Sequence, residues 1–269
     1  MLVNGLPNAC IQAEDRGLSY GDGVFRTLRI RNAKPLHWQH HIEKLRHDCH
    51  ALALPCPDEE TLLAEIIQLA GLRQDAVVKI IVTRGCAQRG YAIPATSQLT
   101  RILDCQPLPQ YPPEYATSGI AVHICRIKLG HQPILAGIKH LNRLENVLAA
   151  SECTEAGFPE GLLEDEAGAV IGGTRSNLFI VRNNALATPD LSRCGVAGVQ
   201  RKRVLMFAHR HAIPCRIDHL RMDDLLAADE IFLVNSVFGL WSVREFAGYL
   251  RSEHPVADKM REWLNEDEA

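Results

Sequence analysis

The chain has 269 residues, of which 46% are hydrophobic and 23% are charged, and its formal net charge is -3. These values are typical of a globular protein that buries a sizeable core in one large domain or two smaller ones. The slightly acidic balance argues against nucleic-acid binding, and no run approaches the ~18 consecutive apolar residues of a membrane helix. The N-terminal MLVNGLPNAC lacks a basic stretch followed by an apolar one, so no signal peptide is expected.

Nine cysteines are spread widely along the chain, and no CxxC pair occurs among them. An odd number at wide spacing is more typical of reduced thiols than of a disulfide framework. The cysteines therefore predict a cytoplasmic protein.

The first half of the chain alternates strand and helix patterns. GVFRTLRI (23–30) alternates apolar and polar residues, which predicts a strand. Apolar residues at helical spacing predict a helix over 37–53, and a second helix is expected over 58–71. AVVKIIVTRG (76–85) and QLTRILDCQPL (98–108) are typical of buried strands.

A proline-rich stretch separates the two halves. QPLPQYPPEYATSG (106–119) holds four prolines, which exclude a regular helix or a central strand. We therefore expect an interdomain linker at 109–118. It would join an N-terminal α/β domain of residues 1–108 to a C-terminal α/β domain of residues 119–269.

The second half again mixes strands and helices. The expected elements, in order, are a strand from 119, a helix over 141–157 ending at Gly157, a hairpin 160–173 turning at 166–168, a hairpin 177–188 turning at Asn183–Asn184, a helix over 198–211, a strand 213–219, a short helix 221–227, a strand 230–235 and a helix over 255–265. The predicted fold class is mixed α/β (α+β), in two domains.

Two short stretches are candidate anion sites. Gly195 and Gly198 precede a helical run, and the free N–H groups of Val199 and Gln200 in its first turn favour an anion. The alternative is a flexible helix entry, because two glycines four positions apart are a weak signal.

The second candidate anion site lies at the end of the apolar strand EIFLVN. Asn235 and Ser236 follow there, and small polar residues at a strand end can hold a phosphate oxygen. Such residues more often simply begin a turn.

Other site patterns are incomplete. His37 and His41 have the i, i+4 spacing of a metal-binding pair, but no nearby cysteine or acidic residue completes a ligand set. The sequence therefore predicts no metal site. GDG (21–23) lacks the full G-x-G-x-x-G and precedes a strand, which excludes a Rossmann nucleotide loop.

Lys139 stands in AGIKHLNRLENVLAA between Ile138 and Leu141, with Gly137 nearby. A lysine shielded by apolar neighbours has a lowered pKa and can act as a nucleophilic amine. Most lysines before a helix are solvated instead, and residue type and spacing alone leave both readings open.

Four stretches together resemble a known family. DRGLSYGDGVFRTLRI, GIKHLNRLENVLA, GGTRSNLFIV and GVAGVQR occur in the order found in fold-type IV pyridoxal phosphate (PLP) enzymes. These class-IV, D-amino-acid-aminotransferase-like proteins include branched-chain and D-amino-acid aminotransferases and 4-amino-4-deoxychorismate lyase. AGIKHLNRLE and TRGCAQRGY look most like the lyase branch. The resemblance implies two α/β domains with PLP between them and, usually, a homodimer.

The resemblance also implies roles for individual residues. Its Schiff-base lysine falls on Lys139, and Thr27 matches a position near the reacting carbons. Arg89 and Tyr91 match a substrate-side loop. The implied phosphate contacts are Lys44, Gly198, Val199, Gln200, Asn235 and Ser236.

Two positions depart from the family pattern. The family's phosphate anchor H-x-x-R is HIEK here, and Lys44 keeps the charge but not the bidentate fork of arginine. Gly172, in VIGGT, stands where the family usually places a glutamate beside the pyridine nitrogen. That carboxylate strengthens the cofactor as an electron sink. We expect Glu164, on the preceding arm of the hairpin, to be a candidate replacement.

The resemblance implies a lyase that converts 4-amino-4-deoxychorismate to 4-aminobenzoate and pyruvate in folate biosynthesis. A D-amino-acid or branched-chain aminotransferase on the same fold is the alternative. Gly172 and Lys44 also leave open a PLP-binding protein without catalytic turnover.

Overall fold

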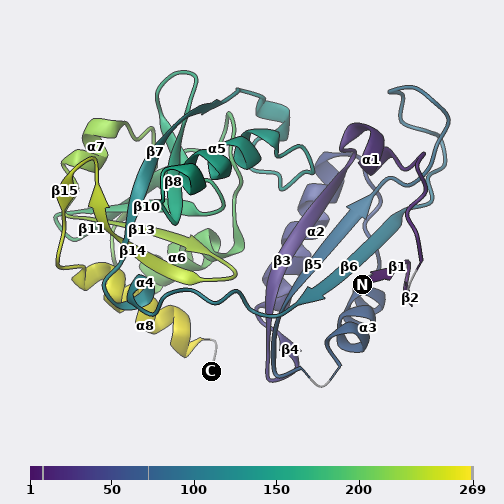
Figure 1. The fold of residues 1–269 in the computed structure, drawn as a ribbon, viewed down its shortest axis with the longest axis horizontal. Coiled ribbons are helices and arrows are strands. Elements are labelled where there is room, and N and C mark those ends of the chain that lie inside the picture. The colour runs from purple at the N-terminus through teal and green to yellow at the C-terminus, as the bar shows by residue number, and fades with distance from the viewer. Residues whose placement is uncertain (8, 72, 268–269) are drawn as a thin grey trace. The chain divides into compact units, whose positions relative to one another are not determined.

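The computed structural model describes residues 1–7, 9–71 and 73–267. The chain forms two compact units, shown in Figure 1: unit 1 is Met1–Pro109 with Ile138–Asn142, and unit 2 is Gln110–Gly137 with the chain from Arg143 onward. Each unit has its own sheet and helices, which confirms the mixed α and β class. The domain limits expected from the sequence (1–108, 109–118 and 119–269) stay a prediction, because compactness does not show which pieces fold independently.

Unit 1 is built on one antiparallel sheet. Its elements are β1 (Leu2–Val3), β2 (Leu6–Pro7), α1 (Arg16–Tyr20), β3 (Gly23–Arg31), β4 (Lys34–Pro35), α2 (Trp38–Ala51), α3 (Glu59–Ala70), β5 (Asp75–Thr83) and β6 (Thr100–Gln106). The six strands lie in the order β2-β1-β6-β5-β3-β4. The long strands β3, β5 and β6 are adjacent, so they form the centre of the sheet.

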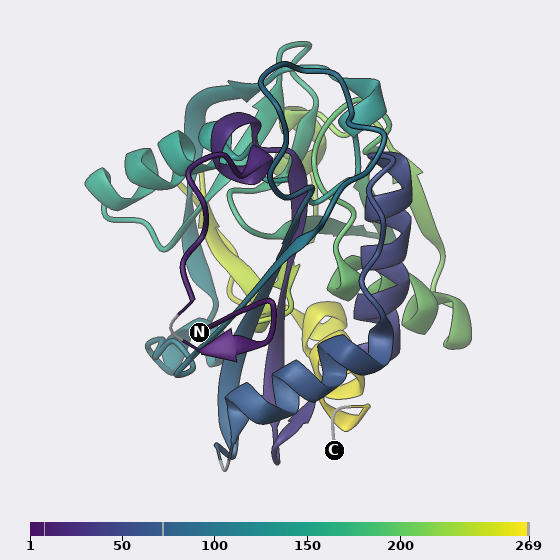
Figure 2. The same cartoon turned by 90° about the vertical axis from the view of Figure 1, so that its right-hand side faces the viewer.

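The alternation along β3 decides which face of this sheet is buried. Val24, Leu28 and Ile30 are buried, whereas Phe25 and Thr27 are half-buried on the opposite face. Helices α2 and α3 cover the buried face and share one apolar core with β3, β5 and β6. Figure 2 shows both helices, in indigo and blue, along the same side of the sheet. Phe25 and Thr27 therefore lie on the face that these helices leave open.

Unit 2 holds the remaining elements. They are α4 (Glu114–Thr117), β7 (Ile120–Leu129), a 3-10 turn (Pro133–Leu135), α5 (Leu144–Glu155), β8 (Glu160–Asp165), β9 (Val170–Gly173), β10 (Asn177–Arg182), β11 (Ala185–Pro189), α6 (Val199–Arg210), β12 (Cys215–Asp218), α7 (Met222–Leu226), β13 (Glu230–Asn235), β14 (Gly239–Phe246), β15 (Tyr249–Leu250) and α8 (Pro255–Glu266). Their sheet runs β12-β11-β10-β13-β14-β7-β8-β9, and β15 pairs with β14. Since β9, at the end of this order, also lies beside β10, the sheet curls on itself.

Alternate residues of the unit 2 strands enter different cores. Phe179 and Val181 of β10 pack with α6 and α8, whereas Leu178 and Ile180 of the same strand pack with β14 and α7 on the other face. A third core lies between α5 and strands β7 to β9. The sheet is thus covered on both faces, as its continuous apolar strands require.

The main expected elements are confirmed, but the structure also differs from the expectation in several places. The helix expected over 141–157 begins only at Leu144, although Gly157 follows its end with φ of 77°. One helical turn, Glu114–Thr117, lies in the proline-rich stretch where a regular helix was excluded. That exclusion was wrong for this turn, because the prolines precede it and proline is tolerated at a helix start. Strand β14 was not foreseen.

Two further expectations concern the chemistry of the chain. All nine cysteines are free thiols. Within the ranges that the structure describes, no helix combines the length and the apolar character that crossing a membrane requires.

Candidate active site

The segment that carries Lys139 adds to the edge of β3. The amide of Phe25 donates to the Lys139 carbonyl (2.9 Å), and the amide of Leu141 donates to the Gly23 carbonyl (3.0 Å). A Cβ at position 23 would lie 2.4 Å from the Val82 carbonyl oxygen of β5 and 2.9 Å from the Leu141 side chain, so glycine suits the point where these segments meet. The backbone of Lys139 is therefore fixed by strand-like hydrogen bonds rather than by the helix that follows.

The side chain of Lys139 lies beside an aromatic ring. Its Nζ is 4.4 Å from the centroid of the Phe25 ring, on the face of the unit 1 sheet that α2 and α3 leave open. Thr27 lies two residues further along β3 and points to the same face. The structure thus places the predicted amine and the predicted threonine on one open face of β3.

A buried carboxylate binds the backbone of Lys139. Asp48 of α2 is fully buried, its Oδ2 accepts from the backbone N–H of Lys139 (3.1 Å), and its Oδ1 accepts from the Lys44 ammonium. Arg26 forms a further ion pair with it. Burial, together with the charges of Arg26 and Lys139, lowers the pKa of Lys44 to about 7, whereas the adjacent carboxylate favours the charged ammonium. The predicted phosphate anchor and the predicted reactive lysine therefore meet at one carboxylate.

His41 on α2 makes the stability of unit 1 sensitive to acid. Burial, followed by the charge of Arg26, lowers its pKa to about 3 from an ordinary value of 6.5. Below pH 6.5 the unfolded chain takes up a proton that the folded chain excludes. This contribution to stability is therefore complete above pH 6.5, and we expect it to fall by about 1.4 kcal/mol per pH unit below that value.

Replacement of His41 by glutamine tests this account. Urea unfolding at about pH 7.5 and about pH 5.5 should show a smaller acid loss in His41→Gln than in the wild type, by about 1 kcal/mol. The exposed His219, replaced in the same way, is the matched control and should behave as the wild type. Equal acid losses in the wild type and His41→Gln would contradict the account.

The loop with the predicted substrate residues is tied to α1. The buried Arg16 donates to the carbonyls of Gly90 (2.8 Å) and Tyr91 (3.2 Å). The Tyr91 ring is 85% exposed and lies 5.2 Å from the Tyr20 ring, and Arg89 is exposed as well. Both predicted substrate residues are therefore free to contact a ligand, on a loop whose base is fixed.

Arg16 itself depends on a carboxylate that sequence reasoning missed. Asp22 accepts from Arg16 Nε and from Arg84 Nε, each at 2.8 Å. Burial raises the pKa of Asp22, but the hydrogen bonds from Arg84 and Arg16 outweigh it, and the pKa lies below its usual value. Arg16 and Asp22 both lie in DRGLSYGDG. The opposite charges in this short stretch were the signal that could have identified the pair.

The predicted phosphate site lies at the start of α6 in unit 2. Gly198 precedes this 12-residue helix, and no side chain caps its first turn. The Gly198 amide donates to Asn177 Oδ1 (3.1 Å), and a Cβ at position 198 would lie 2.3 Å from that oxygen. The amides of Val199 and Gln200 follow at the positive end of the helix dipole, so they are suited to an anion.

Asn235 at the end of β13 serves a turn. Its Oδ1 accepts from the amides of Val237 and Phe238, both at 2.8 Å, and Ser236 is half-buried beside it. The turn that was the alternative for Asn235 is therefore present, and the phosphate role of Asn235 and Ser236 stays a prediction.

Asn177 brings the two anion candidates together. It pairs with Val234 across β10 and β13, one residue before Asn235, and its Nδ2 donates to the Val196 carbonyl (2.8 Å). The start of α6 and the end of β13 thus both lie beside Asn177, a residue that the sequence did not single out. Its only signal was a polar residue at the head of the apolar run NLFIV.

The position of the missing family glutamate is closely confined. A Cβ at Gly172 would lie 2.9 Å from the Ser176 carbonyl oxygen. The turn that supplies this oxygen is built on the buried Glu160, which accepts from the Thr174 amide (2.9 Å) and the Ser176 hydroxyl (3.0 Å). Glu164 forms an ion pair with Lys128 of the neighbouring strand. Glu164 would therefore have to leave this partner before it could serve a cofactor.

Comparisons with known proteins show which family the chain resembles. Residues 23–246 match the family Amino-transferase class IV. Aminodeoxychorismate lyase of Vibrio harveyi is 34% identical over 238 residues, which cover 88% of this chain and 88% of that protein. D-alanine aminotransferase of Bacillus licheniformis is 27% identical, and the match covers 84% of this chain and 79% of that protein.

Solved structures place the fold in the same group. The crystal structure of 4-amino-4-deoxychorismate lyase from Pseudomonas aeruginosa has a TM-score of 0.94 and 42% identity, over 99% of this chain and 98% of that chain. Branched-chain aminotransferase from Thermoproteus uzoniensis has a TM-score of 0.88 and 22% identity. The match covers 98% of this chain and 93% of that chain, and it shows the shared fold alone. Because the family match spans most of its length, the chain belongs to the class IV aminotransferase family.

Proposed function

We propose that the protein is a PLP-dependent lyase that converts 4-amino-4-deoxychorismate to 4-aminobenzoate and pyruvate, a step of folate biosynthesis. The placement of Lys139 carries the proposal: its backbone is held by Phe25 and Asp48 while its ammonium lies on the open face of β3. The relatives from Vibrio harveyi and Pseudomonas aeruginosa, which bear the lyase name, support this substrate.

The residues present fit PLP. Lys139 offers a half-buried amine for a covalent bond to the cofactor, and the Val199 and Gln200 amides offer an uncapped helix start for its phosphate. Lys44 adds a positive charge as the phosphate anchor, and Asn235 and Ser236 complete the proposed contacts. When bound, PLP withdraws electrons from the carbon that bears the substrate amine.

Lys139 is the residue that moves protons in this proposal. Its amine removes the proton from the amine-bearing ring carbon, and the electron pair left behind completes the aromatic ring as the C–O bond to the enolpyruvyl group breaks. The departing enolate takes a proton at its methylene carbon from Lys139, assisted by the Thr27 hydroxyl, and becomes pyruvate. Arg89 and Tyr91 bind the carboxylates and the ring of the substrate from the exposed loop.

Gly172 favours the lyase over a transaminase. Without a carboxylate at this position the cofactor is a weaker electron sink. Aromatisation supplies driving force to the lyase reaction, whereas a transaminase must stabilise a carbanion without that help. The confined space at Gly172, 2.9 Å from the Ser176 oxygen, makes it unsuited to a larger residue.

An aminotransferase is the second candidate, since D-alanine aminotransferases are among the relatives. The PLP-saturated protein should be mixed with D-alanine and with branched-chain amino acids, and the cofactor absorbance followed. We expect no appreciable conversion of the cofactor to its amine form. Complete conversion within the time of one lyase turnover would contradict the proposal in favour of transamination.

We further propose that the protein is a cytoplasmic homodimer. Leu144, Val147 and Leu148 line one side of α5 at helical spacing and are 71%, 59% and 51% exposed, which is costly unless a partner covers them. The free cysteines are consistent with a reducing compartment.

Replacement of Leu148 by glutamate should halve the mass measured by light scattering in solution, because a charge would be buried in the interface. The matched control is Met206→Glu on α6, where a 43% exposed apolar side chain is also replaced. If Leu148→Glu keeps the wild-type mass, α5 is not the dimer surface.

A further inference from the structure

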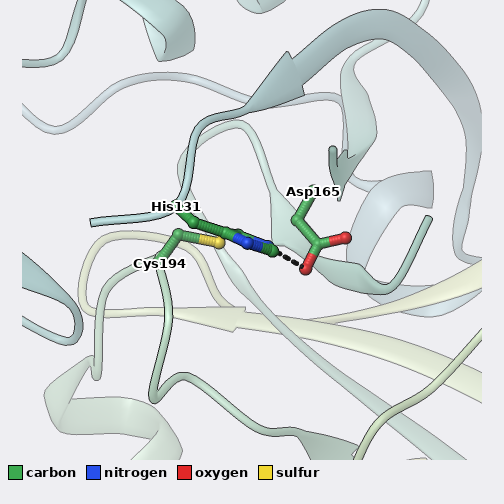
Figure 3. Close-up of side chains that lie close together, drawn as sticks. All are labelled: His131, Asp165 and Cys194. Carbon is green, nitrogen blue, oxygen red and sulfur yellow. Dashed lines mark hydrogen bonds and ion pairs between the residues drawn. The ribbon is translucent and has the colours of Figure 1, made fainter. Parts of the chain in front are cut away.

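Three potential metal ligands lie close together in unit 2, and none of them has a role in the site described above. His131 follows β7, Asp165 ends β8, and Cys194 precedes the segment that leads to α6. Their ligand atoms all lie within 4.8 Å of one another. Figure 3 shows the Cys194 sulfur beside the His131 ring and the hydrogen bond from that ring to Asp165. His131 Nε2 lies 2.8 Å from Asp165 Oδ2. No short motif links residues so far apart in the chain, which explains why the sequence predicts no metal site.

The backbone fixes the segments that carry these residues. The Gln132 amide donates to the Arg193 carbonyl (2.9 Å), which joins the neighbours of His131 and Cys194. The Glu166 amide donates to the Leu129 carbonyl (3.2 Å), which joins the end of β8 to the end of β7. The three side chains are therefore held close together before any ion binds.

The second ring nitrogen of His131 and the second carboxylate oxygen of Asp165 also have polar partners. His131 Nδ1 lies 3.3 Å from Glu166 Oε1, and Asp165 Oδ1 accepts from the amides of Ala167 (2.9 Å) and Ala169 (2.8 Å). Metal-bound histidines usually give their second ring nitrogen to a carboxylate, and metal-bound carboxylates are themselves hydrogen-bonded. The surroundings of the cluster follow this pattern.

The local charge favours a cation. Cys194 and Asp165 are buried. The Glu166 carboxylate lies beside His131. A divalent ion in the cluster would be neutralised by one thiolate and one carboxylate.

We propose that His131 Nε2, Asp165 Oδ2 and Cys194 Sγ bind one zinc ion per chain, with water in the fourth position. A sulfur, nitrogen and oxygen donor set is typical of zinc rather than of calcium or magnesium. The thiol proton and the proton between Nε2 and Oδ2 leave to solvent. Donors on a tetrahedral zinc ion lie about 3–4 Å apart. The Nε2–Oδ2 pair, at 2.8 Å, would therefore open slightly, and the longer separations, which do not exceed 4.8 Å, would shorten.

The site has a structural consequence. Gly137 donates to the Gly195 carbonyl (3.0 Å), and Ala197 donates back to the Gly137 carbonyl (3.0 Å). A zinc ion on His131 and Cys194 cross-links the same two segments at a second point. It would therefore stabilise the segment that ends at Gly198, where α6 begins.

Zinc content tests the proposal without an activity measurement. The PLP-loaded protein is dialysed to equilibrium against buffered micromolar zinc chloride, and zinc per chain is measured by mass spectrometry. All proteins carry Cys10→Ser and Cys86→Ser, because these two exposed thiols bind zinc adventitiously. We expect one equivalent in this background, and a loss of at least tenfold in affinity for His131→Ala and for Cys194→Ser. Cys215→Ser, a partly buried thiol outside the cluster, is the matched control and should keep the full equivalent.

Thermal unfolding distinguishes a residue that binds zinc from a residue that only supports the fold. Zinc should raise the Tm of the background protein and leave the Tm of the correctly folded Cys194→Ser variant unchanged. Absence of bound zinc, or equal binding by the background and both cluster variants, would overturn the proposal. Neither result depends on the lyase reaction, so the proposed function stands or falls separately.

Discussion

Replacement of Lys139 by alanine is expected to lower the turnover of 4-amino-4-deoxychorismate by at least about 10³-fold. The variant loses both the covalent attachment to PLP and the base that moves the proton. Borohydride treatment should attach the cofactor to the wild-type chain and not to Lys139→Ala. Turnover by the wild type that is lost in Lys139→Ala would exclude the remaining alternative, a PLP-binding protein without turnover.

Lys79 offers a matched control for this experiment. Its Nζ lies 5.2 Å from the centroid of the same Phe25 ring, compared with 4.4 Å for Lys139, but its side chain is exposed. Lys79→Ala should keep covalent cofactor and most of its turnover. If Lys139→Ala retained more than about a tenth of the wild-type rate, Lys139 would not be the general base.

Replacement of Asp48 by alanine should destabilise the fold by about 3–5 kcal/mol, because Arg26 and Lys44 would lose the carboxylate that balances their buried charges. Asp48→Asn should also destabilise, since it keeps an acceptor for the Lys139 amide but not the charge. Urea unfolding of the two variants measures the effect.

The control for Asp48 is an exposed aspartate. Asp223→Ala, at the start of α7, should change the free energy of unfolding by no more than about 0.5 kcal/mol. An effect of Asp48→Ala as small as that of the control would mean that the ion pairs of Asp48 contribute no net stability. The role assigned to Asp48 in holding Lys139 would then fail as well.

Long elements with a clear period were predictable from the sequence. The strand expected over 23–30 is β3 (Gly23–Arg31), because alternation alone defines its buried face. The helix expected over 37–53 is α2 (Trp38–Ala51), and it is shorter because His37 and Ala53 have positive φ values of 53° and 46°. Such terminal residues are set by local backbone conformation, which apolar periodicity does not report.

Elements that depend on distant partners were not predictable. The helix was expected to begin at Leu141, yet the Leu141 amide pairs with the Gly23 carbonyl, so α5 begins later than expected. β14 (Gly239–Phe246) was missed, because its apolar residues do not alternate simply with polar ones. Some of them pack in the core that includes α7 and others in the core that includes α8. Tertiary contact overrides local pattern in both cases.

The same distinction applies to the site. Residue type and neighbours made Lys139 and Gly198 candidates, and the resemblance to the family added their predicted roles and those of Thr27 and Lys44. Asp48 carries no such signal, since it meets Lys139 across 91 positions of the chain. Asn177 was missed for the same reason, because its hydrogen bonds reach Val196 and Gly198 on another segment.

The lyase activity is tested most directly by product stoichiometry. The PLP-saturated protein is mixed with 4-amino-4-deoxychorismate, and 4-aminobenzoate fluorescence and pyruvate are followed together. The account predicts equal release of both products, with Lys139→Ala inactive. Failure of a PLP-loaded, folded protein to release either product would contradict the lyase assignment and make Gly172 and Lys44 marks of a different activity.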